Sequence, residues 1–304
     1  MALKIIPDET KLNFLGKKYL AFVLSAFLLC ATVFLVSTKG LNFGIDFTGG
    51  ILIDAEFEQD VDLGKMRDLL KNANIGDVSL QTFGKPNEIL IRIGENSDIE
   101  SDRIIIIDNI KKILTDNFSG HIEYRKVDYV GPKVGGELIK SGALSLILAF
   151  CAMMIYIWLR FEWQYGVGAI VALFHDAIIT VGFFSITQLE FNLSSIAAIL
   201  TIIGYSINDS VVIFDRIREN LRKFKKMPME ELLNVSINNN LARTILTSFT
   251  TLVALLALVL MGGEVIKSFS MAALFGVLVG TYSSIYIASP VLIYMNLRPE
   301  TKPA

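Results

Sequence analysis

The sequence predicts an α-helical polytopic membrane protein, with six transmembrane helices and one extracytoplasmic α+β domain of the ferredoxin-like kind. Of its 304 residues, 53% are hydrophobic and only 19% are charged, against about 25% charged residues in soluble domains. Six apolar stretches are long enough to cross a bilayer. The segment 38–138, by contrast, is rich in charge and alternates between strand and helix patterns.

Each predicted span approaches the roughly 20 apolar residues that about 30 Å of hydrocarbon requires. The spans cover 19–37, 141–159, 166–187, 193–214, 245–261 and 269–294. The first is longer than the apolar region of a signal peptide and no small-residue cleavage site follows it, so we expect an uncleaved anchor. The other predicted parts are an N-terminus 1–18, the outer domain 38–138, a five-helix region 139–296 containing a loop 215–242, and a tail 297–304.

Positive charge in the short connections predicts the orientation of the spans. The N-terminus, the turn at Arg160, the loop 215–242 and the tail together carry 13 Lys and Arg residues. The two short loops on the opposite side carry only Lys267. Both termini and the loop 215–242 are therefore expected on the cytoplasmic side of the membrane. Trp158 and Trp163 flank the Arg160 turn, as aromatic residues at a membrane interface do.

The outer domain is expected to have the order β-α-β-β-α-β. Apolar residues alternate over 51–57, which suits a half-buried strand, and they recur at helical spacing over 63–70. A hairpin is predicted from 78–83 and 88–93, followed by a helix over 104–114 and a last strand over 121–130. This order is that of the ferredoxin-like split βαβ unit. Such a fold implies no chemistry by itself.

Several kinds of chemistry are excluded by what the sequence lacks. No phosphate-binding loop of the G-x-x-x-x-G-K-[ST] type occurs, so ATP hydrolysis is not expected. His121 and His175 are the only histidines, and the only cysteines, Cys30 and Cys151, lie in apolar stretches. A metal site, a cofactor and an enzyme activity are therefore not expected. The net charge of −2 gives no basis for nucleic-acid binding.

Ionisable residues inside the spans are the strongest candidates for function, because each costs about 2.5–3.5 kcal/mol at the centre of a membrane helix. Asp176 lies near the middle of span three, next to His175, and Asp209 lies toward the cytoplasmic end of span four. Arg243 stands at the cytoplasmic entrance to span five. The supporting polar residues are Ser206, Asn208 and Asp215 of span four and its end, and Thr244 and Thr247 of span five.

Two interpretations of these residues remain open. Asp209 and Arg243 could form an interhelical salt bridge that only holds the helices together. Alternatively, the buried charges form a protonatable relay along an interior path, and Asp176, too deep to reach water, favours this interpretation. His175 is expected to point about 100° away from Asp176 around the helix. Asp215 is expected to be a solvated helix end.

Six motifs occur in order along the chain and cover most of it. They are 43–50 (FGIDFTGG), 130–137 (VGPKVGGE), 174–176 (FHD), 203–220 (IGYSINDSVVIFDRIREN), 240–248 (NLARTILTS) and 280–290 (GTYSSIYIASP). This ordered set resembles the SecF family, the membrane subunits of bacterial SecD–SecF protein-export complexes within the resistance-nodulation-division (RND) superfamily. The first motif supplies Gly44, Asp46, Gly49 and Gly50 as family positions.

The resemblance implies a subunit of the Sec machinery that uses the proton-motive force to assist late translocation of preproteins. It implies SecD as the partner half, with the SecYEG translocon channel, YajC and the translocating preprotein as further partners, and H⁺ or Na⁺ as the coupling ion. The ion-conducting Asp and Arg of the family correspond to Asp209 and Arg243. The alternative function is one half of an RND-type transporter for small molecules or lipids.

Overall fold

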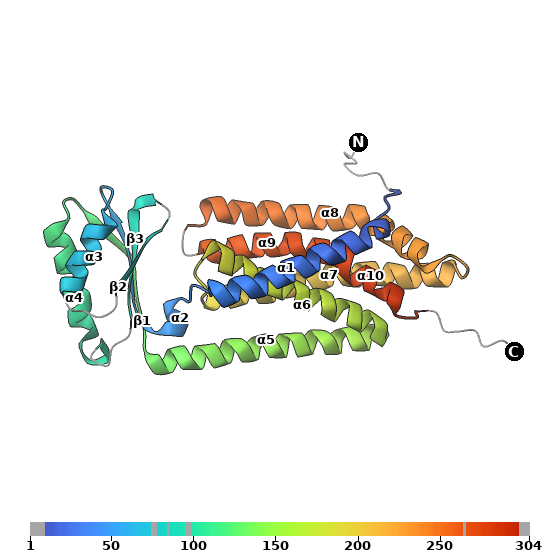
Figure 1. The fold of residues 1–304 in the computed structure, drawn as a ribbon, viewed down its shortest axis with the longest axis horizontal. Helices are drawn as coiled ribbons and strands as arrows, with labels where there is room; N and C mark the ends of the chain where they lie inside the picture. The colour runs from blue at the N-terminus through green and yellow to red at the C-terminus, as the bar shows by residue number, and fades with distance from the viewer. Residues whose placement is uncertain (1–9, 74–77, 84, 95–98, 264–265, 298–304) are drawn as a thin grey trace. The chain divides into compact units, whose positions relative to one another are not determined.

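The structure is a computed structural model that describes residues 10–73, 78–83, 85–94, 99–263 and 266–297 (Figure 1). Two compact units divide the chain. The first contains the segments Met1–Asn42 and Ser145–Ala304, and the second is Phe43–Leu144. The boundary between them falls inside one helix, α5 (Pro132–Arg160).

The described residues contain six helices that are long and apolar enough to cross a membrane, as predicted. They are α1 (Lys18–Thr38, after a 3₁₀ turn Leu15–Lys17), α5, α6 (Trp163–Thr187), α7 (Leu193–Lys223), α8 (Met229–Met261) and the helix that begins with α9 (Lys267–Ser283). Helices α6, α7 and α9 are the inner helices of the first unit. In the most apolar part of each of them 56% of the residues are buried, against 17% for α1 and 11% for α5 and α8.

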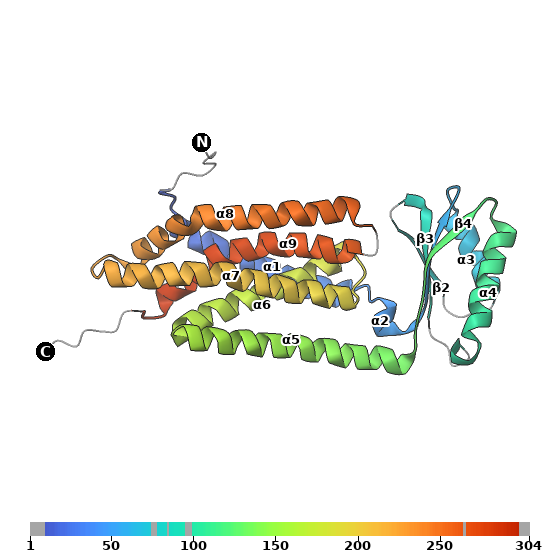
Figure 2. The same ribbon diagram turned by 180° about the vertical axis from the view of Figure 1, so that it is seen from behind.

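The segment 215–242, predicted as the loop between spans four and five, is mostly helical, a feature that the sequence analysis did not predict. Helix α7 continues to Lys223 and α8 begins at Met229, so the connection itself is short (Figure 2). Apolar residues hidden among the charges pack the two extensions together, since Ile217, Leu232 and Leu233 are fully buried. The Asn220 side chain also donates a hydrogen bond to the Ser236 hydroxyl over 2.8 Å. The resulting hairpin lies at the end of the bundle where α1 begins.

The sixth span is irregular near its end. After α9 it makes a π-helical turn, Ser284–Ala288, before the short α10 (Ser289–Val291). Pro290 explains the change, because proline has no backbone N–H and its ring clashes with the carbonyl one turn earlier. The Ser289 hydroxyl donates to the Ser284 carbonyl oxygen over 2.8 Å, across this turn. Helix α6 approaches this turn closely, since a side chain at Gly168 would lie 2.8 Å from the Ala288 carbonyl oxygen.

The segment before α1 is fastened to α8 by two asparagine side chains. Asn238 pairs with the backbone of Leu12 in both directions, accepting from its N–H over 2.9 Å and donating to its carbonyl over 2.8 Å. Asn234 accepts from the Phe14 N–H over 2.9 Å. These bonds tie the beginning of α1 to the part of α8 that precedes Arg243.

The second unit holds the predicted ferredoxin-like sheet. Its elements are β1 (Gly50–Phe57), α3 (Leu63–Asn72), β2 (Val78–Phe83), β3 (Lys85–Ile93), α4 (Ile99–Asn117) and β4 (Ile122–Val130). The strands are antiparallel in the order β2-β3-β1-β4. Pairing of Ile51 with Ile93 and of Ile53 with Ile91 gives one apolar face. Met66 of α3 and Ile110 of α4 pack on this face and bury it.

A tight turn in front of β1 uses the two consecutive glycines. The short helix α2 (Ile45–Thr48) follows Gly44 and ends at Gly49. Gly49 and Gly50 have φ of 72° and 111°, a conformation that side-chain-bearing residues rarely adopt. Gly135 at the beginning of α5 lies against this turn, since a Cβ there would be 3.4 Å from the Phe47 carbonyl oxygen. The glycines therefore shape the entry into the sheet.

A cluster of charges on the sheet predicts acid sensitivity of this domain. Glu88 is 4% exposed, and Arg125 donates to its carboxylate over 3.1 Å while also pairing with Glu56. Burial alone would raise the pKa of Glu88, but hydrogen bonds from Arg125 and Lys85 outweigh it and lower this pKa below the ordinary value of 4.5. A lowered pKa means that the folded state binds fewer protons than the unfolded state, so this stabilisation is lost as pH falls toward the lowered value.

We predict that the isolated segment 43–131 folds by itself and unfolds more easily as pH falls below 4.5, with Glu88→Gln removing part of that pH dependence. Urea unfolding followed by circular dichroism between pH 3 and 7 measures this. Asp116→Asn, at an exposed carboxylate of α4, is the matched control and should leave the pH dependence as in the wild type. An unchanged pH dependence in Glu88→Gln would contradict the assignment.

Candidate functional site

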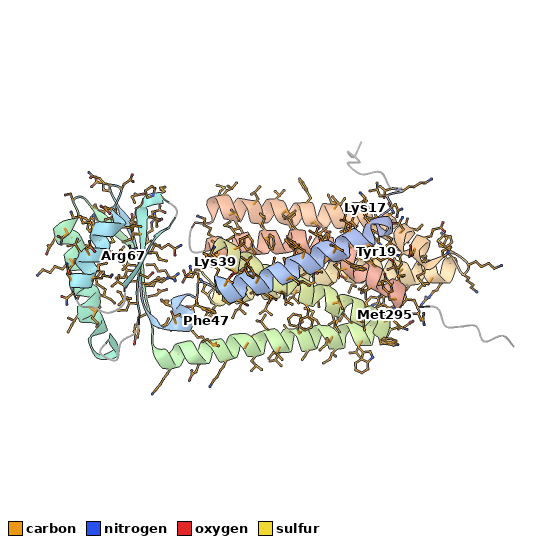
Figure 3. The ribbon with its side chains drawn as sticks, viewed as in Figure 1. Lys17, Tyr19, Lys39, Phe47, Arg67 and Met295 are labelled. Atoms are coloured by element: carbon orange, nitrogen blue, oxygen red, sulfur yellow. The ribbon has the colours of Figure 1, made fainter. Side chains whose placement is uncertain are left out.

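The helix bundle, drawn with its side chains in Figure 3, contains a buried polar network. The Asp176 carboxylate lies at the centre of this network and has no exposed surface. The hydroxyls of Ser206 on α7 and Ser283 on α9 donate to its Oδ2 atom over 2.5 and 2.7 Å. Its Oδ1 atom lies 2.8 Å from Nδ1 of His175. Three helices therefore supply polar partners to one carboxylate.

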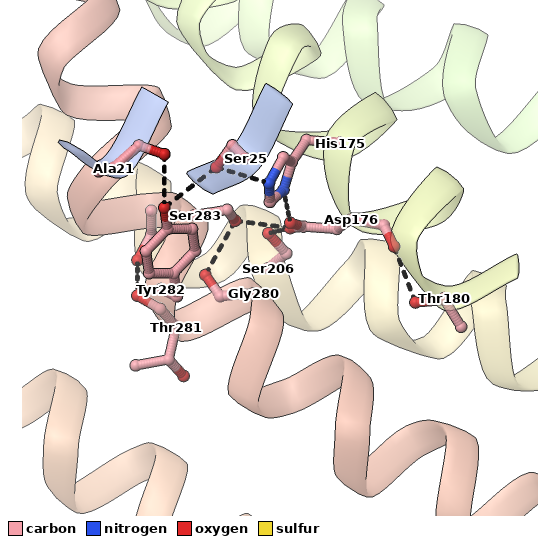
Figure 4. Close-up of polar contacts among 11 residues, drawn as sticks. Ala21, Ser25, His175, Asp176, Thr180, Ser206, Gly280, Thr281, Tyr282 and Ser283 are labelled. Atoms are coloured by element: carbon pink, nitrogen blue, oxygen red, sulfur yellow. Dashed lines mark hydrogen bonds and ion pairs between the residues drawn. The ribbon is translucent and has the colours of Figure 1, made fainter. Parts of the chain in front are cut away.

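The network continues from His175 to α1 and α9, as Figure 4 shows. Nε2 of His175 lies 3.1 Å from the Ser25 hydroxyl, which in turn lies 3.0 Å from the Tyr282 hydroxyl. Tyr282 is the last member of this hydrogen-bond network, and its hydroxyl donates to the Ala21 carbonyl oxygen over 2.9 Å. The connected polar groups thus join α1, α6, α7 and α9.

His175 was expected to point away from Asp176, and the structure corrects this. Adjacent residues on a helix do leave the axis about 100° apart. The imidazole nevertheless turns back so that Nδ1 reaches the neighbouring carboxylate while Nε2 reaches α1. The imidazole can link two helices in this way because each of its two nitrogens can donate or accept a hydrogen bond.

Close helix contacts bring these groups together. A Cβ at Gly276 would lie 2.2 Å from a side-chain carbon of Ile202, and one at Gly280 would lie 3.1 Å from Cβ of Ser206. Helices α7 and α9 therefore touch through glycine, which is typical of small residues in membrane helix pairs. This approach, with the π-helical turn that follows, positions Ser283 against Asp176.

Apolar surroundings separate the network from water on the α1 side. A hollow of about 480 Å³ lies between α1, α6 and the end of the sixth span. Its polar side chains are Ser25 and His175, and the rest of its lining is aliphatic or aromatic. This side of the network therefore faces an apolar space.

Asp209 is a second buried carboxylate, and its surroundings differ sharply from those of Asp176. It is 3% exposed, and its Oδ2 atom has no hydrogen-bond partner among the described residues. Arg243 acts on it electrostatically but does not form an ion pair with it in the described part of the chain. Leaving a buried polar group without a partner is costly, which marks Asp209 as an unusual position.

The other residues predicted on α7 and α8 spread around Asp209. Asn208 and Arg243 are exposed on the surface of the single chain, whereas Thr244 is 2% exposed. The Thr247 hydroxyl donates to the Arg243 carbonyl oxygen over 3.0 Å, so it does not bridge the two charged side chains. The direct salt bridge between Asp209 and Arg243, one of the two interpretations of the sequence, is not formed in the part of the chain that the structure describes.

Asp215 was expected at a solvated helix end, but α7 continues for about two turns beyond it, and its side chain is half-exposed within the helix. Both of its carboxylate oxygens accept from Nη2 of Arg160 over 2.9 Å. The side chains of Asp215 and Arg160 are 44% and 46% exposed. The family positions Gly44, Asp46, Gly49 and Gly50 belong to the other unit, at the turn before β1.

Three residues of the network were missed by the sequence interpretation: Ser25, Tyr282 and Ser283. Tyr282 and Ser283 fall inside the motif 280–290, so their type was noticed but no role was assigned. Ser25 is a single hydroxyl in an apolar stretch, and nothing in its sequence surroundings distinguishes it. Within the described residues, no group of three or more His, Cys, Asp and Glu side chains is arranged to hold a metal ion.

Comparison with known proteins identifies the family. The family model for the protein export membrane protein SecD/SecF, C-terminal, matches residues 109–298, and the model for the SecD/SecF GG motif matches 34–61. The chain belongs to the SecD/SecF protein-export family. Among its relatives, the protein translocase subunit SecF of Rickettsia bellii strain OSU 85-389 is 50% identical over 299 residues, 98% of each chain. That of Rickettsia rickettsii strain Sheila Smith is 51% identical over 301 residues, covering 99% of this chain and 97% of the other.

Solved structures of SecDF have the same fold. SecDF from Thermus thermophilus, described as a translocon-associated membrane protein, matches with a TM-score of 0.87 and 33% identity over 97% of this chain. The match spans 40% of the longer SecDF chain. SecDF in a super-membrane-facing form gives a TM-score of 0.67 and 31% identity over 95% of this chain and 39% of the other. The similarity supports membership of the Sec protein-export machinery and does not favour a transporter of small molecules or lipids.

We predict that removing both hydroxyl donors of Asp176 destabilises the bundle. A hydrogen bond to a charged group contributes about 1.5–3 kcal/mol, so Ser206→Ala with Ser283→Ala should lower the thermal unfolding midpoint of the purified chain clearly. Ser248→Ala is the control, because that buried hydroxyl bonds only the neutral hydroxyls of Tyr205 and Thr281. Equal losses of thermal stability in the double variant and the control would show that Asp176 does not depend on these donors.

Proposed function

We propose that this chain forms one half of a proton-driven complex with a SecD subunit, assisting late preprotein translocation through the Sec channel. Within it, Asp209 is the group that binds and releases the coupling proton, and Arg243 is its counter-charge. Asp176 and His175 hold the helices in register around them. The single observation that carries this assignment is the contrast between two buried carboxylates. Both oxygens of Asp176 have partners, whereas one oxygen of Asp209 has none among the residues that the structure describes.

The contrast matters because a coupling group must be stable in two protonation states. Asp176 receives hydrogen bonds from Ser206 and Ser283, and both would be disturbed if its Oδ2 atom took up a proton. Asp209 has no such bond at Oδ2 among the described residues, so protonation there breaks no contact with them. The neutral acid is also easier to bury than the carboxylate. Asp209 is therefore the better site for reversible proton binding.

The energies permit such a switch. A unit charge crossing a potential of 100 mV exchanges about 2.3 kcal/mol. This is similar to the cost of about 2.5–3.5 kcal/mol for one charged side chain at the centre of a membrane helix. One proton per step can therefore drive Asp209 between an ionised state that attracts Arg243 and a neutral state that releases it, and allow α7 and α8 to shift.

Exposed polar groups on α7 and α8 support a partner half. Asn208 and Thr201 on α7, and Arg243 and Thr250 on α8, are exposed on the single chain although they lie on membrane-spanning helices. Polar and charged side chains in a membrane usually face protein rather than lipid. A SecD subunit is the partner we propose for this face, in keeping with the SecDF structures to which the chain is similar.

The remaining partners and the location follow from the same proposal. We place the chain in the bacterial inner membrane. Both termini would lie on its cytoplasmic side, on the basis of the asymmetric distribution of Lys and Arg. SecYEG, YajC and the preprotein are the proposed partners outside the SecD pair. The ferredoxin-like domain, which has its own core, would act mechanically on the emerging preprotein.

We predict that Asp209→Asn and Arg243→Ala each abolish proton-dependent export and proton flux, because the first fixes the neutral state and the second removes its counter-charge. Flux is measured per assembled complex in vesicles with an imposed potential and a pH indicator, and repeated with Na⁺ in place of the proton gradient. Asp215→Asn is the control and should be milder, because that carboxylate is half-exposed and already paired with Arg160.

If Asp209 has a purely structural role, its substitution should have a different effect. Asp209→Asn would then reduce the yield or thermal stability of the complex while the surviving complex kept its flux. Wild-type flux per complex in Asp209→Asn would defeat the assignment, and flux that follows Na⁺ alone would replace the proton as the coupling ion.

A further inference from the structure

A hollow lined only by charged side chains lies at the end of the bundle, away from the buried carboxylates. It has a volume of about 540 Å³ and opens between the end of α5 and the last turns of α7. Its lining consists of Arg160, Asp215, Arg218, Glu219, Arg222 and Lys223. We refer to these six residues as the α5–α7 hollow. None of them has a part in the proton-coupling proposal, apart from the use of Asp215 as a control.

The charges of the hollow do not cancel. Asp215 is neutralised by both of its contacts with Arg160. Glu219 is neutralised by Arg216, which is outside the lining and donates to it over 2.6 Å. The positive charges of Arg218, Arg222 and Lys223 therefore remain in excess. A concave surface with three uncompensated cations suits an anion.

Two of the guanidinium groups are held in place by one aromatic ring. The guanidinium carbons of Arg160 and Arg218 lie 4.9 and 5.4 Å from the centroid of Phe161, which is itself buried. Nη1 of Arg218 also donates to the Arg160 carbonyl oxygen over 3.2 Å. Cation–π contacts and this bond limit the freedom of both side chains. An arginine side chain that is already held in place loses less conformational entropy when it binds a ligand.

The surroundings of the hollow are those of a membrane interface. Trp158 and Trp163, at the turn between α5 and α6, are 75% and 59% exposed. Tryptophan gathers at the level of lipid headgroups. The last turns of α5 leave apolar side chains uncovered, with Leu159 85% and Ile155 57% exposed. Headgroup-level cations and an uncovered apolar helix surface thus occur on the same end of α5.

We propose that the α5–α7 hollow binds the phosphate headgroup of an anionic phospholipid, with the acyl chains lying along the exposed apolar end of α5. Arginine recognises phosphate oxygens through paired N–H donors. Basic pockets between transmembrane helices are suited to anionic headgroups such as those of phosphatidylglycerol and cardiolipin. The lipid would brace α5 against the extended end of α7, where the Arg160–Asp215 pair and the bond from Arg218 to the Arg160 carbonyl oxygen also join the two helices.

The test uses the full-length chain in its complex, purified in detergent, with lipid retention measured by native mass spectrometry and by thermal stabilisation. The probes are phosphatidylglycerol, phosphatidylcholine and inorganic phosphate. The pocket variant is Arg222→Gln with Lys223→Gln. Its matched control is Lys225→Gln with Lys226→Gln, which removes the same charge from the neighbouring exposed residues that do not line the hollow.

We expect the wild type and the control to retain phosphatidylglycerol in preference to phosphatidylcholine. The pocket variant should bind phosphatidylglycerol roughly 10- to 30-fold more weakly, the effect of two interfacial charges. An equal loss in the control would reduce the effect to general charge attraction and overturn the site. Stabilisation by inorganic phosphate as strong as that by phosphatidylglycerol would also overturn the lipid assignment, since it would leave a phosphate site only.

Discussion

The Asp176 carboxylate is the interaction on which the bundle depends. A carboxylate without solvent contact is tolerated only when its oxygens are paired, because an isolated buried charge is very costly. Here α7, α9 and His175 supply that pairing, and His175 passes the constraint on to α1. The charge therefore fixes the relative positions of four helices that apolar packing alone would leave free to slide, since lipid tails are as apolar as leucine.

The backbone of α9 is adapted to this constraint. Gly276 and Gly280 allow α9 to approach α7, and Pro290 places a π-helical turn directly after Ser283. Such turns are rare and are often found at functional sites. The irregularity of the sixth span therefore lies next to Ser283, the residue of α9 that donates to the buried Asp176 carboxylate. Asp209, only a few residues beyond Ser206 on α7, lies outside this network, and its Oδ2 atom has no hydrogen-bond partner in the described parts of the chain.

Sequence patterns predicted the fold well because length and periodicity determine it. Six apolar stretches and the alternation at Ile51 and Ile53 were sufficient for the spans and the sheet. The helical structure of 215–242 was not predicted because its many charges obscure the apolar residues, such as Leu232 and Leu233, that pack its helices together. Charge marks a segment as outside the membrane without deciding whether it is helical.

The site was predicted less completely, for a different reason. Position along a helix gives the depth of Asp176, Asp209 and Arg243, but their mutual distances depend on helix rotation, which the sequence does not specify. The partner of Asp176 on α9, Ser283, is 107 residues away in the sequence. Single hydroxyls such as Ser25 look the same whether they bond their own helix or a histidine on another.

The account makes Asp209 the carboxyl that changes protonation and Asp176 the one that stays paired. The most direct measurement is an infrared titration of the assembled complex, following the C=O stretch of protonated carboxyl groups while pH is varied. We predict a titrating band that disappears in Asp209→Asn and persists in Asp176→Asn. A titrating band that persists in Asp209→Asn and is lost in Asp176→Asn would contradict the central claim.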